Sequence, residues 1–201
     1  MKNSKYVFLV SVIQEGQAII DSLQLIKIAN HPYQVYGNER EHCLIITGIG
    51  PQKTQQVMND ILDPQKELFS QPSKIKWINI GIAGHQIYPV GSFFEITQFS
   101  FNQRSYVIES PPRSPPIFPE ASLQTHEDFV IDYPTDFIVD MEGFIIAESL
   151  NNKGYLSHLR VFKLISDNQH QSLLKDHQSK TVLAHTLKTH VLTLIRQLQI
   201  N

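Results

Sequence analysis

Dense runs of apolar residues alternate along this chain with longer segments in which apolar residues recur every three or four positions. The dense runs are typical of strands buried inside a sheet, and the longer segments are typical of helices with one buried face. The pattern predicts strands at 6–13, 33–36, 42–47, 76–82, 91–99, 137–139 and 158–165, and helices at 14–28, 51–62, 144–150 and 181–198. Such alternation predicts an α/β fold in which one sheet carries helices on both faces.

A cluster of prolines interrupts this alternation. Residues 109–124 contain five prolines, and proline neither donates to a strand ladder nor fits inside a helix. We therefore predict a surface loop or an irregular crossover there, and not a helix or an inner strand. The rest of the sequence has no internal repeat and no linker-like segment, so we expect a single domain over residues 1–201.

Composition narrows the classes of partner. The 201 residues are 41% hydrophobic, which is enough for a core, and their formal net charge is -2. The sequence has no large basic block, so we expect no nucleic-acid partner, because such binding needs many cations to neutralise phosphates. No apolar stretch is long enough to span a bilayer, and the N-terminal apolar run lacks a signal-peptide cleavage site. We expect no membrane partner.

Cysteine and histidine usage argues against disulfide and metal chemistry. The only cysteine, Cys43, stands among apolar residues of the predicted strand 42–47. It cannot form an internal disulfide, and we expect it to be a core residue of a cytoplasmic protein. The nine histidines are scattered, and only His185 and His190 come near a metal-binding spacing. We expect both at the surface and no metal site.

The ends of the predicted strands are the first place to look for a ligand site. In open α/β sheets, ligands bind beyond the carboxyl ends of the strands. Four segments of this chain occupy such positions: Glu15, residues 48–50, residues 81–84 and residues 166–167. Glycine in two of them lets a ligand come close to the backbone, although a plain tight turn explains 48–50 equally well. Neither glycine segment is a dinucleotide fingerprint or a Walker loop.

Three carboxylates also lie near these ends. Asp140 and Glu142 precede the predicted helix 144–150, where Asp140 has the ordinary role of a helix cap. Glu142 has a functional alternative, because a carboxylate that points into a pocket can accept two hydrogen bonds from a sugar diol. Asp167 directly follows a buried strand, which suits a general acid as well as an ordinary turn residue.

Four short motifs, taken together and in order, resemble those of a known superfamily. They are Thr-Gly-Ile-Gly at 47–50, Asn-x-Gly-x-Ala-Gly at 79–84, Asp-Met-Glu at 140–142 and Ile-Ser-Asp at 165–167. The sequence resembles the nucleoside phosphorylase and nucleosidase superfamily, and within it most of all the methylthioadenosine/adenosylhomocysteine nucleosidases. The resemblance covers nearly the whole chain.

The resemblance implies both a fold and a reaction. The implied fold is a three-layer α/β/α sandwich with a mixed, partly barrel-like central sheet, and the implied reaction is cleavage of the N-glycosidic bond of a purine nucleoside. Asp167 would be the general acid at N7 of the base, and Ser166 would position it. Glu15 would orient the attacking water of a hydrolase. No metal or organic cofactor is implied, and a homodimer is expected because two-fold dimers are common.

The resemblance also assigns substrate-binding residues. Glu142 would bind the ribose hydroxyls, and Met141 would pack against the sugar. The other expected contacts come from two short segments, which supply Ala83, Gly84, Phe129 and Val130. Phe129 and Val130 are expected to stack on the base.

The identity of the nucleophile depends on whether a phosphate site exists. Ile82 stands where many relatives carry Ser or Thr, so a hydroxyl that could touch phosphate is missing. Four arginines are available, but none lies in a phosphorylase-like N-terminal loop: Arg40, Arg104, Arg113 and Arg160. We therefore favour hydrolysis over phosphorolysis, with phosphate retained as a possible partner.

Two other interpretations stay open. The short stretch between Phe99 and Asp140 is compatible with a catalytically weak or inactive nucleoside-binding module that retains the fold. Retention of both Glu142 and Asp167 argues for the enzyme. An unrelated α/β domain with chance motif matches is the other alternative, because likeness at the level of fold does not establish function.

Overall fold

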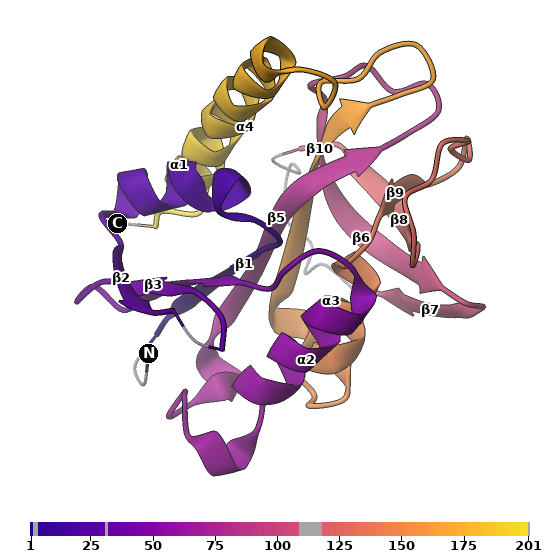
Figure 1. Ribbon diagram of the computed structural model, residues 1–201. Coiled ribbons are helices and arrows are strands. Elements are labelled where there is room, and N and C mark those ends of the chain that lie inside the picture. Colours follow the sequence, from indigo (N-terminus) through magenta and orange to yellow (C-terminus); the bar gives the residue numbers. More distant parts are fainter. Residues whose placement is uncertain (2–3, 31, 109–117, 201) are drawn as a thin grey trace.

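The computed structural model describes residues 1, 4–30, 32–108 and 118–200. Figure 1 shows strands in the middle of the molecule, α1 beside α4 on one side, and α2 beside α3 on the other. The strands are β1 Tyr6–Val10, β2 Ile26–Ala29, β3 Val35–Gly37, β4 His42–Ile46, β5 Lys76–Gly84, β6 Phe93–Phe101, β7 Arg104–Val107, β8 Glu120–Thr125, β9 Ile138–Asp140 and β10 Leu159–Asp167. The helices are α1 Ile13–Leu23, α2 Pro51–Ile61, α3 Gly143–Asn151 and α4 His177–Gln197.

The strands form one mixed sheet, part of which closes on itself. Strand β1 runs parallel to its neighbours β4 and β5, and β5 runs parallel to β10. Strand β10 then pairs with β6, β6 with β8, β8 with β9, and β9 returns to β5. These five strands close a ring, while β4, β3 and β2 extend the sheet beyond β1. The mixed α/β sheet is confirmed, and the three-layer sandwich stays a prediction.

Side-chain alternation along the buried strands divides the core between the two faces of the sheet. In β1, Val7 and Leu9 belong to one apolar cluster, and Phe8 and Val10 belong to the other. Helices α2 and α3 contribute to the first cluster, whereas α1 and α4 contribute to the second. Successive strand residues point to opposite faces, so a run without polar residues requires cover on both sides. Cys43 is buried in β4, as predicted.

Two sequence predictions about elements are wrong. The predicted helix 14–28 ends at Leu23, because Gln24 adopts a left-handed conformation with φ 53°, and Ile26–Ala29 is a strand. The segment 109–124 was expected to lack inner strands, yet Glu120–Thr125 lies between β6 and β9. All five prolines precede residue 120, so this strand retains every backbone N–H. Residues 109–117 lie outside the described residues.

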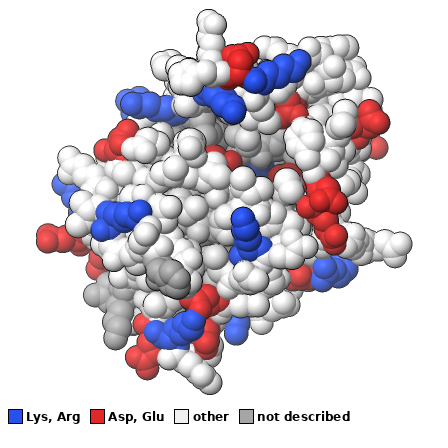
Figure 2. Space-filling model, in the orientation of Figure 1, with Lys and Arg blue, Asp and Glu red and all other residues white. Residues whose placement is uncertain are grey.

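Figure 2 shows basic and acidic side chains scattered over one face, and a hollow in that face with acidic side chains at it. None of the helices in the described ranges combines the length and the apolar character needed to cross a membrane.

Candidate active site

A pocket of about 160 Å³ lies at the carboxyl ends of the central strands. Every residue predicted to be catalytic or substrate-binding lines it: Glu15, Ala83, Gly84, Phe129, Val130, Met141, Glu142, Ser166 and Asp167. These residues come from five separate parts of the chain, and parallel pairing of β1, β5 and β10 brings three of those parts to one edge. The described part of the chain contains no cluster of side chains suited to a metal ion.

Asp167 is the last residue of β10 and is held from both sides. A register shift between Ile165 and Asp167 brings Asp167 opposite Gly84. The Ser166 hydroxyl donates to Oδ1 of Asp167 and also lies 3.2 Å from the carbonyl oxygen of Ala83. The phenol of Tyr133 donates to Oδ2. A direct hydrogen bond therefore supports the expected role of Ser166 in positioning Asp167. Tyr133 is a further partner of Asp167 that sequence reasoning missed.

Glu15 lies in the first turn of α1 with its carboxylate in the pocket. Its Oε2 accepts hydrogen bonds from the backbone N–H groups of Ser11 at 2.8 Å and Val12 at 3.3 Å. Its Oε1 accepts one from the backbone N–H of Ile82 at 3.2 Å. Burial raises the pKa of Glu15, and the nearby ammonium of Lys163 opposes that rise. The backbone therefore fixes both oxygens of this carboxylate.

Glu142 precedes α3 and receives a hydrogen bond from the turn after β4. The backbone N–H of Gly50 donates to its Oε1 at 2.7 Å. Gly50 has φ 93°, a conformation that favours glycine. Glycine at this position therefore allows the turn to point this N–H at the carboxylate. Burial raises the pKa of Glu142 to about 7, and the negative charge of Asp140 adds to the rise. The turn at 48–50 is thus part of the site.

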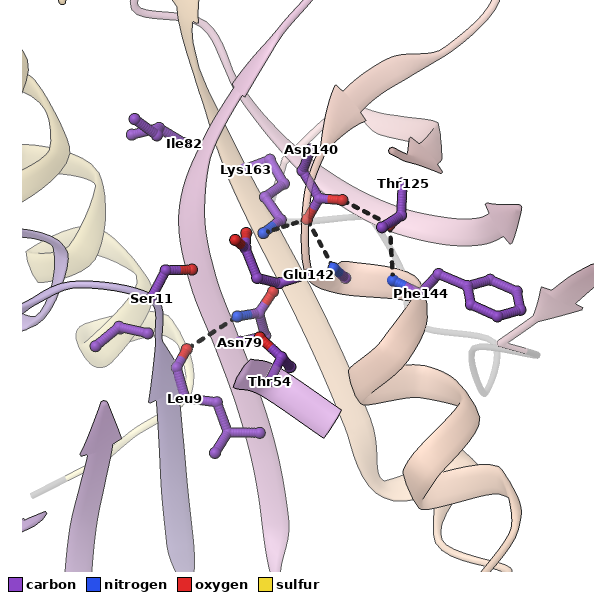
Figure 3. A network of polar contacts seen from close by, with 12 residues as sticks. Leu9, Ser11, Thr54, Asn79, Ile82, Thr125, Asp140, Glu142, Phe144 and Lys163 are labelled. Atoms are coloured by element: carbon purple, nitrogen blue, oxygen red, sulfur yellow. Dashed lines mark hydrogen bonds and ion pairs between the residues drawn. The ribbon is translucent and has the colours of Figure 1, made fainter. Parts of the chain in front are cut away.

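Lys163 is a second residue of this site that the sequence analysis missed. It lies in the middle of β10 with its side chain 1% exposed, and its Nζ is 2.8 Å from Oδ2 of Asp140 (Figure 3). Burial disfavours its charge, but Asp140, Glu142 and Glu15 together outweigh that cost and raise its pKa. A lysine inside the otherwise apolar run 161–165 was the available signal, because lysine is rarely buried without a partner.

The absence of a side chain at Gly81 makes room for this cluster. Gly81 lies opposite Lys163 in the paired strands β5 and β10. A Cβ atom at position 81 would lie 3.0 Å from Nζ of Lys163 and 3.4 Å from Oε1 of Glu15. Any larger side chain would therefore push apart the two charged groups that approach here from β10 and α1.

Asp140 is both a helix cap and an ion-pair partner. Its Oδ2 accepts from the backbone N–H of Gly143 at 2.8 Å, and its Oδ1 accepts from the Thr125 hydroxyl at 2.6 Å (Figure 3). The same hydroxyl accepts from the backbone N–H of Phe144 at 2.9 Å. The capping interpretation of Asp140 agrees with these contacts, and the cap also fixes one ligand of the Lys163 ammonium.

The positions predicted to face the sugar and those predicted to face the base differ in burial. Met141 is half-buried, and Ala83 and Gly84 are buried at the end of β5. Phe129 lines the pocket with 66% of its surface exposed. A side chain that is this exposed beside a pocket is available to cover a ligand.

The arginines considered for a phosphate site lie elsewhere. Arg104 pairs with Glu148, and Arg160 pairs with Glu95 through two hydrogen bonds of 2.6 Å. Arg40 is exposed after β3, and Arg113 lies outside the described residues. Among the residues that the structure describes, the pocket lining contains no arginine.

Comparison with known proteins finds the fold but no sequence relative. The sequence matches no family model, and no curated protein matches it. The structure is similar to a 5′-methylthioadenosine/S-adenosylhomocysteine nucleosidase of Campylobacter jejuni, with TM-score 0.71, 12% identity and coverage of 96% of this chain and 97% of that chain. It is also similar to 5′-methylthioadenosine nucleosidase of Arabidopsis thaliana, with TM-score 0.74, 15% identity and coverage of 100% and 98%.

A third similar structure holds a ligand. It is a nucleosidase of Chlamydia trachomatis bound to MTA, with TM-score 0.67, 18% identity and coverage of 92% of both chains. All three likenesses extend over nearly the full length of both chains. The chain therefore has the fold of the nucleoside phosphorylase and nucleosidase superfamily, which its four motifs resemble.

Proposed function

We propose that this protein is a purine nucleosidase, which hydrolyses the bond between the base and the ribose. The observation that carries the proposal is the meeting of Glu15, Glu142 and Asp167 in one pocket. Each of these carboxylates suits a different part of a nucleoside: water, sugar and base. The nucleosidase folds of the similar structures support the same reaction class.

Asp167 is proposed as the general acid. A purine leaves more easily when its N7 is protonated, and a carboxyl group that shares a proton with N7 supplies that assistance. The Ser166 hydroxyl holds Oδ1 of Asp167 and so fixes the plane of the carboxyl group. General-acid catalysis of this kind contributes about two to four orders of magnitude to the rate.

Glu142 and Met141 are proposed to bind the sugar. Gly50 occupies Oε1 of Glu142, and no hydrogen bond within the described residues engages Oε2, which leaves that oxygen available for the ribose hydroxyls. Buried Asp140 and Glu15 add negative charge beside it, with one ammonium, Lys163, among the three carboxylates. This excess of negative charge stabilises the positive charge that develops on the ribose as the base departs.

Water is proposed as the nucleophile, with Glu15 orienting it. A phosphate ion would have to enter beside three carboxylates and would find no arginine in the described lining. The Ile82 backbone N–H, which an anion could use, already donates to Glu15. These points favour hydrolysis over phosphorolysis, since uncharged water enters without repulsion.

A homodimer is proposed on the basis of the pocket mouth. Ile49 is 54% exposed and Phe129 is 66% exposed, and both line the pocket. Apolar side chains exposed together at a ligand site are covered more often than isolated ones. Light scattering at micromolar concentration should give about twice the chain mass of 23.0 kDa, and a monomer would contradict this part of the proposal.

The function is tested with adenosine, inosine, methylthioadenosine and adenosylhomocysteine, each with and without phosphate, by chromatography of the released base. We expect release without phosphate, and we expect Asp167→Asn to lower kcat by about 10²–10⁴. Asp21→Asn is the matched control, because Asp21 is exposed on α1 outside the pocket. Release that requires phosphate would identify a phosphorylase, and binding without release would identify a binding module.

A further inference from the structure

The general acid proposed above has no free oxygen in this structure. The Ser166 hydroxyl donates to Oδ1 of Asp167, and the Tyr133 phenol donates to Oδ2. A base that shares a proton with Asp167 must reach one of these oxygens. A carboxylate oxygen can accept a second hydrogen bond, so the room beside each donor decides which of the two gives way to the base.

Tyr133 also occupies space beside the acid. Its ring lies so close to the backbone of Gly84 that a Cβ atom at position 84 would collide with ring carbons and with the phenol oxygen. Gly84 closes the small-residue segment at the end of β5, which the sequence analysis assigned to the substrate pocket. The ring of Tyr133 thus lies against the end of β5, in the lining of the pocket where the substrate is proposed to bind.

The two donors differ in how firmly they are held. Ser166 is 1% exposed in β10, and its oxygen also contacts the carbonyl of Ala83. Tyr133 is half-buried on the segment 131–137, which has no helix or strand and which includes Ile131 at 80% exposure. Moving Ser166 would disrupt a central strand, whereas moving Tyr133 displaces only a surface segment.

His85 ties this segment to the end of β5 by one further contact. Its Nδ1 accepts hydrogen bonds from the backbone N–H groups of Ile87 at 3.1 Å and Tyr88 at 2.9 Å. Its Nε2 therefore carries the proton and donates to the Thr135 carbonyl at 3.1 Å. The segment thus has an attachment at Thr135, two residues beyond Tyr133, that does not involve the tyrosine side chain.

We propose that Tyr133 is a positioning residue. Its phenol holds Asp167 in the free enzyme, and the purine displaces this phenol from Oδ2 when the substrate binds. This inference rests on the proposed nucleosidase function, because it assigns the displaced contact to the base of the substrate. The phenol competes with the base for the same oxygen, so every substrate molecule that binds must first break one hydrogen bond of the protein.

Tyr133→Phe tests this competition, because it removes the phenol oxygen and keeps the ring. We expect KM for the best substrate to fall by about tenfold, the factor that one lost hydrogen bond of ordinary strength represents. The tighter binding should appear as the lower KM, and kcat/KM should therefore rise. Adenine, measured by calorimetry, should likewise bind the variant about tenfold more tightly than it binds the unmodified protein.

Tyr33→Phe is the matched control. Tyr33 is also half-buried and donates from its phenol to an aspartate, Oδ2 of Asp60 at 2.8 Å, but it does not line the pocket. We expect this variant to leave KM and adenine binding unchanged. An equal effect of both variants would overturn the proposal, because the change would then be general to the protein.

The other outcomes separate this inference from the proposed function. If the unmodified protein releases base but Tyr133→Phe leaves KM unchanged, or lowers kcat at every pH, the competition is refuted and the function stands. If neither protein releases base, tighter adenine binding by Tyr133→Phe retains the competition and refutes the hydrolase. If neither protein releases base and adenine binds to neither, both proposals fail.

Discussion

Strand β10 carries two buried ion pairs of opposite character. Arg160 meets Glu95 one to one, with Nε and Nη2 each 2.6 Å from a separate carboxylate oxygen. Lys163, three residues further along the strand, meets Asp140 at 2.8 Å and also attracts Glu15 and Glu142. The first pair balances its charges. The second cluster has one ammonium for three carboxylates.

This difference in charge balance distinguishes the Arg160–Glu95 pair, which stabilises the fold, from the Lys163 cluster, which lies in the candidate site. The bidentate contact engages both carboxylate oxygens of Glu95, while Nη1 of Arg160 has no hydrogen-bond partner within the described residues. A cluster with surplus negative charge is costly to bury. Burial therefore raises the pKa values of carboxyl groups such as Glu15 and Glu142, because protonation removes charge. Perturbed carboxyl groups in a cleft are typical of functional sites, because structure alone gains nothing from such repulsion.

Removal of Lys163 should have the largest effect on stability. Lys163→Met leaves the carboxylates at Glu15, Asp140 and Glu142 without their buried cation. We expect the free energy of unfolding to fall by about 3–5 kcal/mol, the usual cost of breaking a buried pair from one side. Urea unfolding at pH 7.5 measures it. A loss no greater than that of the Arg160 variant below would remove the contrast between the two pairs.

Glu142→Gln should stabilise the protein at alkaline pH while it lowers activity. The pKa of Glu142 is raised to about 7 from an ordinary value of 4.5, so the folded state favours its protonated form. That contribution to stability is complete below pH 4.5 and is lost as the pH rises through 7. Glutamine mimics the protonated form, so the variant should be more stable at pH 8 by about 3 kcal/mol.

Thermal unfolding of this Glu142 variant and of the unmodified protein between pH 5 and pH 8 checks the sign. The difference in Tm should be largest at pH 8 and should shrink toward pH 5. A constant difference over this range would contradict the assignment, since a group with the same pKa in the folded and unfolded states contributes no pH dependence. The rise in nucleoside KM for the variant should be largest at pH 8, where Glu142 of the unmodified protein is ionised and glutamine has no charge to offer the sugar.

Arg160→Met should cost less than Lys163→Met and should leave catalysis alone. The Arg160 and Glu95 side chains are 16% and 10% exposed, so solvent screens the carboxylate that stays behind. We expect a loss of about 1–2 kcal/mol in the free energy of unfolding, between the values for surface and buried pairs. The release of base should keep its rate, and a drop in kcat would show that this pair also serves the site.

Gly81→Ala should have the smallest effect on stability and should act on the site. The new methyl group would lie 3.0 Å from Nζ of Lys163, which is the mobile end of a long side chain and can shift. We expect a loss of about 1 kcal/mol or less, together with a severalfold rise in KM, because the shift also moves Glu15. Circular dichroism and substrate kinetics measure the two effects. Unchanged KM would place the cluster outside substrate binding.

The sequence predicted the elements with strong patterns and missed those that depend on partners. Strand β1 has four consecutive fully buried residues, so its apolar run was sufficient. Strand β2 has three exposed residues and pairs only at the edge with β3, which makes its pattern look like the end of a helix. Strand β8 owes its place to β6 and β9, and no local signal next to the prolines reveals those partners.

The sequence predicted those residues of the candidate site that belong to recognisable motifs. Glu142 and Asp167 stand in short motifs at strand ends, where the neighbouring residues identify them. Lys163 and Tyr133 stand in no such motif. Their importance comes from contacts with Asp140 and Asp167 across the fold, over sequence separations that a pattern of local residues does not encode.

The closed ring of strands has a consequence for the timescales of the site. Strand β10 is bonded along one edge to β5 and along the other to β6, so its amides open only when the ring opens. The segment that carries Tyr133 has no such ladder. Hydrogen exchange should therefore be slow along β10, whose last residue is the proposed general acid, and fast in the segment 131–137, which carries Tyr133.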